Sequence, residues 1–415
     1  MGDINAVKAK IQAEALARWK AAGKKGLLAM GTGTGKTKVA LDRVAELHLE
    51  TSHAEMPHSP RVLLVVPTEK LRDENWPEEA HKWGMTTQYL TYVEGYCYAS
   101  LSKKPSGHYD LVILDEAHRI TDLGAIGLDA ITYDELMALS ATPPKDEEKK
   151  RLLDRIAPTV FTYSIDQGVE DGVVADYTVV VVEVPPDSKD KYIAGGSKAK
   201  PFKQTEASRY AYINKQIEPL QIQLRELQKQ IYAQILVHEA TGDDTELDKL
   251  RREKQKLEPR VQRLISQRMH LIYGLKAKTE LAKKVLVKVM PGTRGIVFAG
   301  SIKQAEELMK ETFHSKTTDE YLTAFKAEKI PWIAVVNALN EGHNVPNVDV
   351  GVVVQLSSNE RDLIQRIGRI IRYREGHKGV IYILVAAGTQ DEKWAKKALE
   401  SIDPSRIIYL SHNNF

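Results

Sequence analysis

The sequence has little cysteine, no long hydrophobic run and almost no net charge, and each absence narrows the possible functions. Cys97 is the only cysteine of the 415 residues, so an intramolecular disulfide is excluded, and no Cys/His group has zinc-ligand spacing. No apolar run approaches the roughly 18 residues that a membrane helix needs, and the first residues lack the apolar core of a signal peptide. The net charge of +3 is compatible with a polyanion partner but does not by itself argue for one. We therefore expect a cytoplasmic protein that makes no membrane contact.

Short apolar runs recur along the chain in two groups, with helical stretches between them. With 42% hydrophobic residues, a chain of this length can form two cores. Such runs are typical of strands buried on both faces of a parallel sheet, and their alternation with helices is typical of α/β domains. The first group is Gly26–Met30, Val62–Val66, Leu111–Leu114 and Met137–Leu139. The second group is Thr178–Val184, Gly295–Ala299, Trp332–Val336, Val350–Leu356 and Val380–Val385.

The two groups predict two α/β domains in tandem, with an insertion in the second. We expect the first domain over residues 1–150, a linker region over 151–176, and the second domain over 177–207 and 276–415. Residues 208–275 have no strand signal and carry heptad-like apolar spacing, which predicts an antiparallel helical hairpin. Pro259 within its second helix is expected to kink that helix or to start a new turn. The spaced apolar residues are Ile217, Leu220, Leu224, Leu227 and Ile231, then Leu250, Leu257, Val261, Leu264 and Leu271.

A glycine-rich loop follows the first apolar run. It is Gly31-Thr32-Gly33-Thr34-Gly35-Lys36-Thr37, and a helical stretch comes after it. Strand, glycine loop, Lys-Thr and helix form the P-loop arrangement, in which backbone N–H groups cradle phosphate oxygens. We expect Lys36 to reach the β- and γ-phosphates of ATP, and Thr37 to hold Mg²⁺. Met30 stands where the full pattern has its first glycine, and the alternative is a glycine turn that happens to precede Lys-Thr.

A pair of carboxylates ends the apolar run of residues 109–114. In Asp115-Glu116-Ala117-His118, Asp115 is expected to bind the Mg²⁺ hydration shell, and Glu116 to polarise the attacking water as general base. The alternative is an ordinary acidic helix N-cap. Because a P-loop precedes the pair, we interpret it as the acidic half of an ATP site.

Asp-Glu-Ala-His is the form of this motif in superfamily-two helicases, and further motifs resemble that family in its order. The resemblance implies two RecA-like domains that hydrolyse ATP in the cleft between them. It implies that Gln12 recognises adenine, that Gly342 contributes to the ATP site, and that His118, Ser140 and Thr142 couple hydrolysis to strand binding. It also implies contacts with DNA by Pro67, Thr68, Thr91, Tyr92, Gly300, Ser301, Asn337 and Asn344. The alternatives are a solvated Gln12, a strand-ending turn at residues 67–68, sheet packing at residues 91–92 and a surface histidine at 118.

The segment Gln365-Arg-Ile-Gly-Arg-Ile-Ile-Arg372 closely resembles the sixth helicase motif. Arg369 and Arg372 are three residues apart and would share one helix face. The resemblance implies that both are arginine fingers on the γ-phosphate and that Gln365 senses the nucleotide; the alternative is a basic surface helix. DEAD-box RNA helicases carry a second glycine where Ile371 stands. The segment is therefore more similar to the DNA-directed branch, which includes UvsW-like and RecG-like helicases and restriction motors, and to compact bacteriophage helicases.

These features predict an ATP-dependent DNA helicase or translocase that moves along single-stranded, forked or branched DNA, with 3′ to 5′ polarity implied by the resemblance alone. A bacteriophage protein would act in the host cytoplasm. The alternatives are an RNA helicase, a duplex translocase that does not unwind, and a non-catalytic scaffold. Residues 247–268 hold eight Lys or Arg and three acidic residues. Arg251, Arg252 and Arg260 are thus candidates for DNA contact, and the alternatives are a solvated face or an arm that docks a protein partner.

Overall fold

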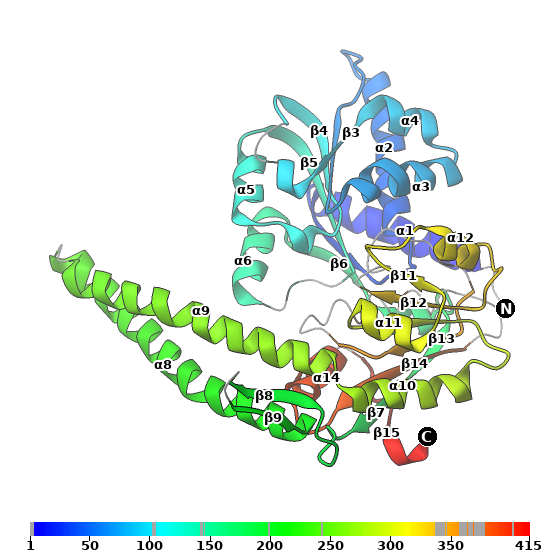
Figure 1. The fold of residues 1–415 in the computed structure, drawn as a ribbon. Coiled ribbons are helices and arrows are strands. Elements are labelled where there is room, and N and C mark those ends of the chain that lie inside the picture. Colours follow the sequence, from blue (N-terminus) through cyan, green and yellow to red (C-terminus); the bar gives the residue numbers. More distant parts are fainter. Residues whose placement is uncertain are drawn as a thin grey trace.

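The computed structural model describes residues 4–101, 105–141, 144, 146–197, 200–241, 244–336, 345, 347–356, 363, 368, 378–400 and 402–415. Two parallel sheets with helices on their faces form two domains, and a long helical hairpin projects from the second (Figure 1). The expected fold class, two parallel-sheet α/β domains in tandem, is confirmed. Within the described residues, no helix combines the length and the apolar character that a membrane span requires.

The first domain is built on a six-stranded parallel sheet in the order β3-β2-β4-β5-β1-β6. Its strands are β1 (Lys25–Met30), β2 (Val62–Val66), β3 (Val93–Cys97), β4 (His108–Leu114), β5 (Thr132–Ser140) and β6 (Thr159–Tyr163). Its helices are α1 (Ile4–Ala21), α2 (Lys36–Ser52), the π-helix η1 (Leu71–Asn75), α3 (Trp76–Lys82), α4 (Thr86–Tyr92), η2 (Tyr98–Ser100), η3 (Ala117–Arg119), α5 (Asp122–Asp129) and α6 (Glu147–Ile156).

Alternate residues of the central strands enter two different cores. In β2, Leu64 and Val66 belong to the core that α1 and α2 cover, whereas Leu63 and Val65 belong to the core on the face of α5 and α6. Successive side chains of a strand point to opposite faces, so a strand covered on both faces must be apolar throughout. All five residues of β2 are buried, which explains the continuous run in the sequence.

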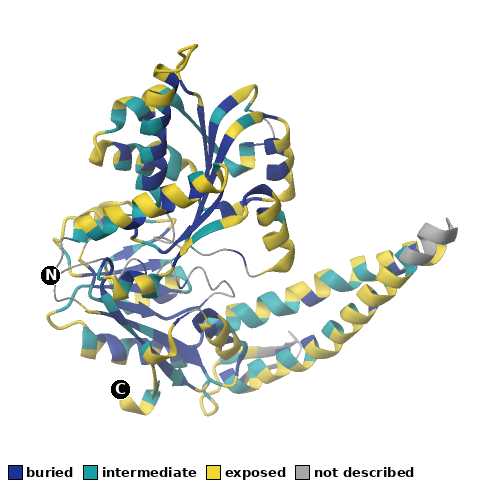
Figure 2. Cartoon of the chain, turned by 180° about the vertical axis from the view of Figure 1, so that it is seen from behind, coloured by how far each residue is buried: buried dark blue, intermediate teal, exposed yellow. Residues whose placement is uncertain are grey.

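The second domain repeats this plan with a seven-stranded parallel sheet in the order β11-β12-β10-β13-β14-β7-β15. Its strands are β7 (Asp176–Val184), β10 (Gly295–Ala299), β11 (Thr312–Phe313), β12 (Trp332–Val336), β13 (Val350–Val353), β14 (Lys378–Ala386) and β15 (Ile407–Ser411). Its helices are α10 (Lys276–Val289), α11 (Ile302–Leu308), α12 (Glu320–Lys326), α14 (Gln390–Leu399), η4 (Pro404–Arg406) and η5 (His412–Asn414). Buried residues fill both sheets, whereas the hairpin is largely half-buried or exposed (Figure 2).

The hairpin consists of α8 (Glu206–Thr241) and α9 (Thr245–Tyr273), and a small antiparallel ribbon of β8 (Ile193–Ser197) and β9 (Lys200–Gln204) precedes it. Ile217 and Leu227 of α8 and Leu250 and Val261 of α9 are buried along the seam. Helix α9 continues through Pro259 as one helix.

The base of the hairpin is held by one buried carboxylate. Glu206 is fully buried and accepts hydrogen bonds from the backbone N–H groups of Lys276, at 2.5 Å, and Asp187, at 2.8 Å, and from the hydroxyl of Tyr192. Lys276 follows the hairpin and Asp187 precedes it. The entry and exit of the insertion therefore meet at the same side chain.

The stretch 151–176, expected to be a linker, also contributes structure to both domains. Strand β6 pairs with β1 at the edge of the first sheet, so the first domain extends past residue 150. Helix α7 (Ile165–Glu170) follows, and Ile165 and Val169 pack against the core of the second domain. The connection between the domains is therefore a packed helix, because its apolar side chains find a core to cover.

Candidate active site

The P-loop lies at the carboxyl edge of the first sheet, where β1 ends and α2 begins. Gly33 and Gly35 have φ values of 83° and 95°, in the left-handed region that only glycine adopts without strain. Gly31 has a different reason to be glycine, since a Cβ there would lie 2.9 Å from Cγ1 of Ile165. The loop is thus shaped by its own glycines and pressed against α7, which leaves its backbone N–H groups near the start of α2.

Side chains of the loop hold it closed. The buried Thr34 hydroxyl donates to the Gly31 carbonyl at 2.7 Å, and the Lys36 ammonium donates to the Met30 carbonyl at 3.2 Å. Gln12 of α1 donates its amide to the Thr34 carbonyl at 3.2 Å. The structure therefore brings Gln12 onto the P-loop, and its role toward adenine stays a prediction.

Thr32 carries the observation that favours a ligand here. Its hydroxyl oxygen is buried and has no hydrogen-bond partner within the described part of the chain. A buried hydroxyl without a partner costs about 1–3 kcal/mol, so such groups in a native fold call for an explanation. An anionic oxygen in the loop would accept its hydrogen bond. The phosphates of a nucleotide fit the residues present.

Gly368 of the second domain lies directly against Thr32. A Cβ at this glycine would overlap the Thr32 hydroxyl. Gly368 is the one described residue of the arginine-rich segment, so at this residue the second domain contacts the P-loop of the first. The remaining residues expected here and in neighbouring motifs lie outside the described residues: Gln365, Arg369, Arg372, Thr142, Gly342, Asn337 and Asn344.

Asp115 follows β4 at the same edge and is held by two donors. Its Oδ2 accepts from the indole N–H of Trp76 at 2.9 Å, and its Oδ1 from the backbone N–H of Glu116 at 2.9 Å. Burial raises the pKa of the Asp115 carboxyl, whereas the indole donor and the nearby Lys36 ammonium act in the opposite direction. The Lys36 ammonium of the P-loop is thus close enough to the acidic motif to lower the pKa of Asp115. The Tyr98 hydroxyl also donates to the Asp115 carbonyl, at 2.9 Å.

Glu116 and His118 join the acidic motif to the next strand. Glu116 has φ 48° and ψ 49°, a left-handed conformation that costs a non-glycine residue free energy and clusters at functional sites. His118 is buried, so it is not a plain surface histidine; its Nδ1 lies 3.0 Å from the Ser140 hydroxyl and 3.4 Å from the Glu116 carboxylate. One imidazole therefore contacts both Glu116 and the last residue of β5, and its coupling role stays a prediction.

The expected DNA contacts are divided between two edges of the sheets. Pro67 and Thr68 follow β2 at the carboxyl edge, the edge that also carries the P-loop, and Thr68 is exposed. Thr91 and Tyr92 end α4 and precede β3, whose first residue pairs with Val62 at the start of β2. They lie at the amino edge, and Tyr92 stacks on His48 with ring centroids 4.9 Å apart. The structure does not bring residues 91–92 to the edge that carries Thr68.

In the second domain, Ser301 caps α11 and Gly300 donates its N–H to Gln304 at 2.9 Å, so both have a local structural role. Arg251, Arg252 and Arg260 are exposed on α9, which belongs to the arm that projects from the second domain (Figure 1). Trp76 and Tyr98 could not be predicted as partners of Asp115, because no sequence spacing connects them to the acidic motif.

Comparisons with known proteins find families and relatives to which this chain is similar. The family "Type III restriction enzyme, res subunit" matches residues 6–95, and "Helicase conserved C-terminal domain" matches residues 277–374. The "DNA 3'-5' translocase XPB2" of Sulfurisphaera tokodaii is 22% identical, over 94% of this chain and 84% of that relative.

Solved structures share the fold at low sequence identity. Dbp5 of S. cerevisiae, bound to RNA and ADP BeF3, has a TM-score of 0.58 at 15% identity, covering 98% of this chain and 90% of that one. The ATP-dependent Type ISP restriction-modification enzyme LlaBIII, bound to DNA, has a TM-score of 0.55 at 15% identity, covering 97% of this chain and 31% of that one. Since one structure holds RNA and the other DNA, the fold alone does not select the nucleic acid.

Proposed function

We propose that this chain, which its two family matches and its relatives support as a superfamily-two helicase, is an ATP-dependent motor that moves along DNA. The proposal includes 3′ to 5′ movement on one strand and unwinding of forked or branched DNA in replication, recombination or repair. The observation that carries it is the contact of Thr32 with Gly368, because a nucleotide bound there would touch both domains at once.

The chain's own residues account for the steps of such a motor. The glycine loop and Lys36 bind the phosphates, and Thr37 and Asp115 would hold Mg²⁺, which supplies positive charge for the phosphates when it is bound. Glu116 takes the proton of the attacking water, and Arg369 and Arg372 stabilise the charge that develops on the γ-phosphate. His118 and Ser140 then transmit the change at Glu116 to the strand-binding segments. Contacts with DNA through phosphates would be sequence-tolerant and salt-dependent.

A translocase that does not separate strands is the second candidate. It is supported by the restriction-enzyme family over residues 6–95 and by a relative that is named a translocase. Strand displacement from a fork, measured beside ATP hydrolysis, separates the two candidates. Hydrolysis stimulated by DNA without displaced strand favours the translocase.

The test of the motor is steady-state ATP hydrolysis without nucleic acid and with single-stranded DNA, forked DNA or RNA at matched salt. Strong stimulation by DNA alone is the expected result, and stimulation by RNA alone refutes the DNA assignment. Glu116→Gln should bind ATP and hydrolyse it very slowly. Lys36→Ala should lose nucleotide affinity, whereas Lys38→Ala, a neighbouring lysine that pairs with Asp42 within α2, should retain it. Equal ATP affinity of the two lysine variants would contradict the P-loop assignment.

A further inference from the structure

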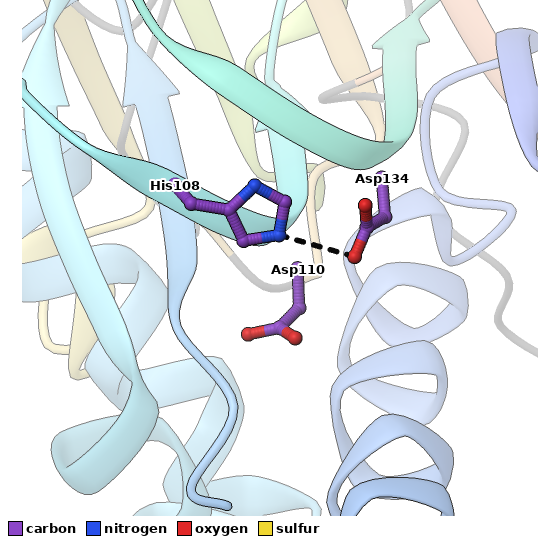
Figure 3. Close-up of side chains that lie close together, drawn as sticks. All are labelled: His108, Asp110 and Asp134. Atoms are coloured by element: carbon purple, nitrogen blue, oxygen red, sulfur yellow. Dashed lines mark hydrogen bonds and ion pairs between the residues drawn. The ribbon is translucent and has the colours of Figure 1, made fainter.

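A second group of titratable side chains lies at the opposite edge of the first sheet from the P-loop. His108 begins β4, Asp110 follows two residues later, and Asp134 lies near the start of β5 (Figure 3). One ligand atom of each lies within 4.8 Å of the other two. Asp115 is seven residues further along than His108, which corresponds to about 20 Å of extended strand. The group is therefore separate from the ATP site.

The sheet register explains why these three residues meet. Residues two apart in a strand point to the same face, so His108 and Asp110 share a face of β4. Tyr109 pairs with Tyr133 and Leu111 with Glu135, which places Asp134 beside Asp110 on the neighbouring strand. Parallel pairing thus fixes the backbone beneath all three side chains before any ligand binds.

His108 has the arrangement of a metal-binding histidine. Its Nδ1 lies 3.1 Å from the Thr132 hydroxyl, and its Nε2 lies 3.1 Å from Oδ2 of Asp134. A histidine that binds a metal with one nitrogen is usually oriented by a hydrogen bond at the other. Metal–ligand bonds of about 2.0–2.2 Å in a tetrahedron separate neighbouring ligand atoms by about 3.3–3.6 Å. The His108–Asp134 spacing of 3.1 Å is close to this range, and the other two pairs lie within 4.8 Å.

Asp110 is oriented by partners that leave its carboxylate free to bind a cation. Its Oδ2 accepts from the backbone N–H of Arg61 at 2.7 Å, and its Oδ1 lies 2.9 Å from Nε2 of His58. Each carboxylate oxygen has a second lone pair, so both bonds are compatible with a metal. The Arg61 guanidinium bonds Glu94 at 2.9 Å, so its positive charge is compensated.

We propose that His108, Asp110 and Asp134 bind one divalent transition-metal ion, Zn²⁺, at this edge, with His58 orienting Asp110 from outside. One imidazole and two carboxylates suit Zn²⁺, whereas Mg²⁺ and Ca²⁺ select oxygen ligands alone. The ion joins β4 to β5, and His58 connects the α2–β2 loop to it. The site is a cross-link of the first domain and does not depend on the proposed motor function.

Calorimetric titration of the full chain with ZnCl₂, without nucleotide, tests the site. We expect one tight site per chain, which His108→Ala and Asp134→Asn weaken by more than tenfold and His58→Ala by roughly tenfold. His53→Ala is the matched control, because that exposed histidine bonds a backbone carbonyl, Leu49, and should leave affinity unchanged.

Asp134→Asn guards against a folding artefact, since the Asp134 side chain is 64% exposed. Thermal unfolding gives a second readout: Zn²⁺ should raise the midpoint of the wild-type chain and leave that of Asp134→Asn unchanged. Zn²⁺ affinity that is the same in His108→Ala, or Mg²⁺ binding as tight as Zn²⁺ binding, would overturn the proposal.

Discussion

Trp76→Phe is the sharpest probe of how the acidic motif is held. The substitution removes the indole N–H that donates to Oδ2 of Asp115 at 2.9 Å and keeps an aromatic ring on the buried face of α3. Asp115 is 8% exposed, so water cannot replace the lost donor in full. Asp115 retains its bond from the Glu116 N–H, and its carboxylate should lose a fixed orientation.

The magnitude follows from the hydrogen bond. A bond to a charged group contributes about 1.5–3 kcal/mol, which corresponds to roughly a 10- to 100-fold change in an equilibrium constant. Loss of an outer partner of a metal ligand costs a similar factor in metal affinity. The Mg²⁺ concentration that gives half-maximal ATP hydrolysis should therefore rise by roughly 10- to 100-fold. Much of the hydrolysis rate should return at high Mg²⁺ concentration.

The assay is the Mg²⁺ dependence of ATP hydrolysis at saturating ATP. Trp83→Phe is the control, since Trp83 is partly exposed and its indole donates to Glu79 at 3.1 Å on the surface. The smaller phenyl ring at position 76 fills less of the buried space and should lower thermal stability. This loss of packing does not by itself change the Mg²⁺ requirement of the folded protein. A Mg²⁺ half-saturation within about twofold of the wild type in folded Trp76→Phe would refute the reasoning, given the tenfold lower bound.

Three further changes test other parts of the structure. His118→Ala breaks the link between the acidic motif and β5, so the ratio of DNA-stimulated to DNA-free hydrolysis should fall. Asp391→Ala leaves Lys278, 1% exposed and 2.6 Å from the lost carboxylate, as an uncompensated buried charge. The free energy of unfolding in urea should fall by about 3–5 kcal/mol. The hydrogen bond from Arg43 lowers the pKa of Glu50 in the folded protein. The contribution of Glu50 to the free energy of unfolding is therefore complete above the ordinary glutamate pKa of about 4.3, and it is lost as the pH falls through the lowered pKa. The stability gap between wild type and Glu50→Gln should be below about 1 kcal/mol, because Glu50 is half-exposed, and should close on acidification.

The interior of both sheets could be predicted from the sequence, and their edges could not. Every strand found as a continuous apolar run has a neighbour on each side, as β2 and β10 do. Of the missed strands, β3, β6, β11 and β15 form the four edges of the two sheets, and β8 and β9 form the separate ribbon. Edge strands such as β3 are half-buried, so their sequences mix polar and apolar residues without a clear period.

For the candidate active site, the local motif could be predicted from the sequence, whereas contacts between distant residues could not. The glycine loop between β1 and α2 could be predicted, because a contiguous motif determines its own local geometry. Contacts across the chain could not, since nothing in the spacing of Trp76 and Asp115 indicates that they share a hydrogen bond. Residues 91–92 show what a short pattern leaves open. A short pattern suggested a DNA contact, but parallel pairing puts the start of β3 at the edge away from the ATP site.

The closed base of the hairpin makes its reach adjustable. The chain enters and leaves the insertion at Glu206, so the two ends of the arm stay close together whatever its length. For the rest of the second domain, the arm is equivalent to a short loop. The 36 residues of α8 extend about 54 Å at 1.5 Å per residue. Adding or removing one heptad in each helix would move the tip by about 10 Å and keep the seam in register. Insertions and deletions in steps of seven can therefore change what the arm touches while both sheets keep their fold.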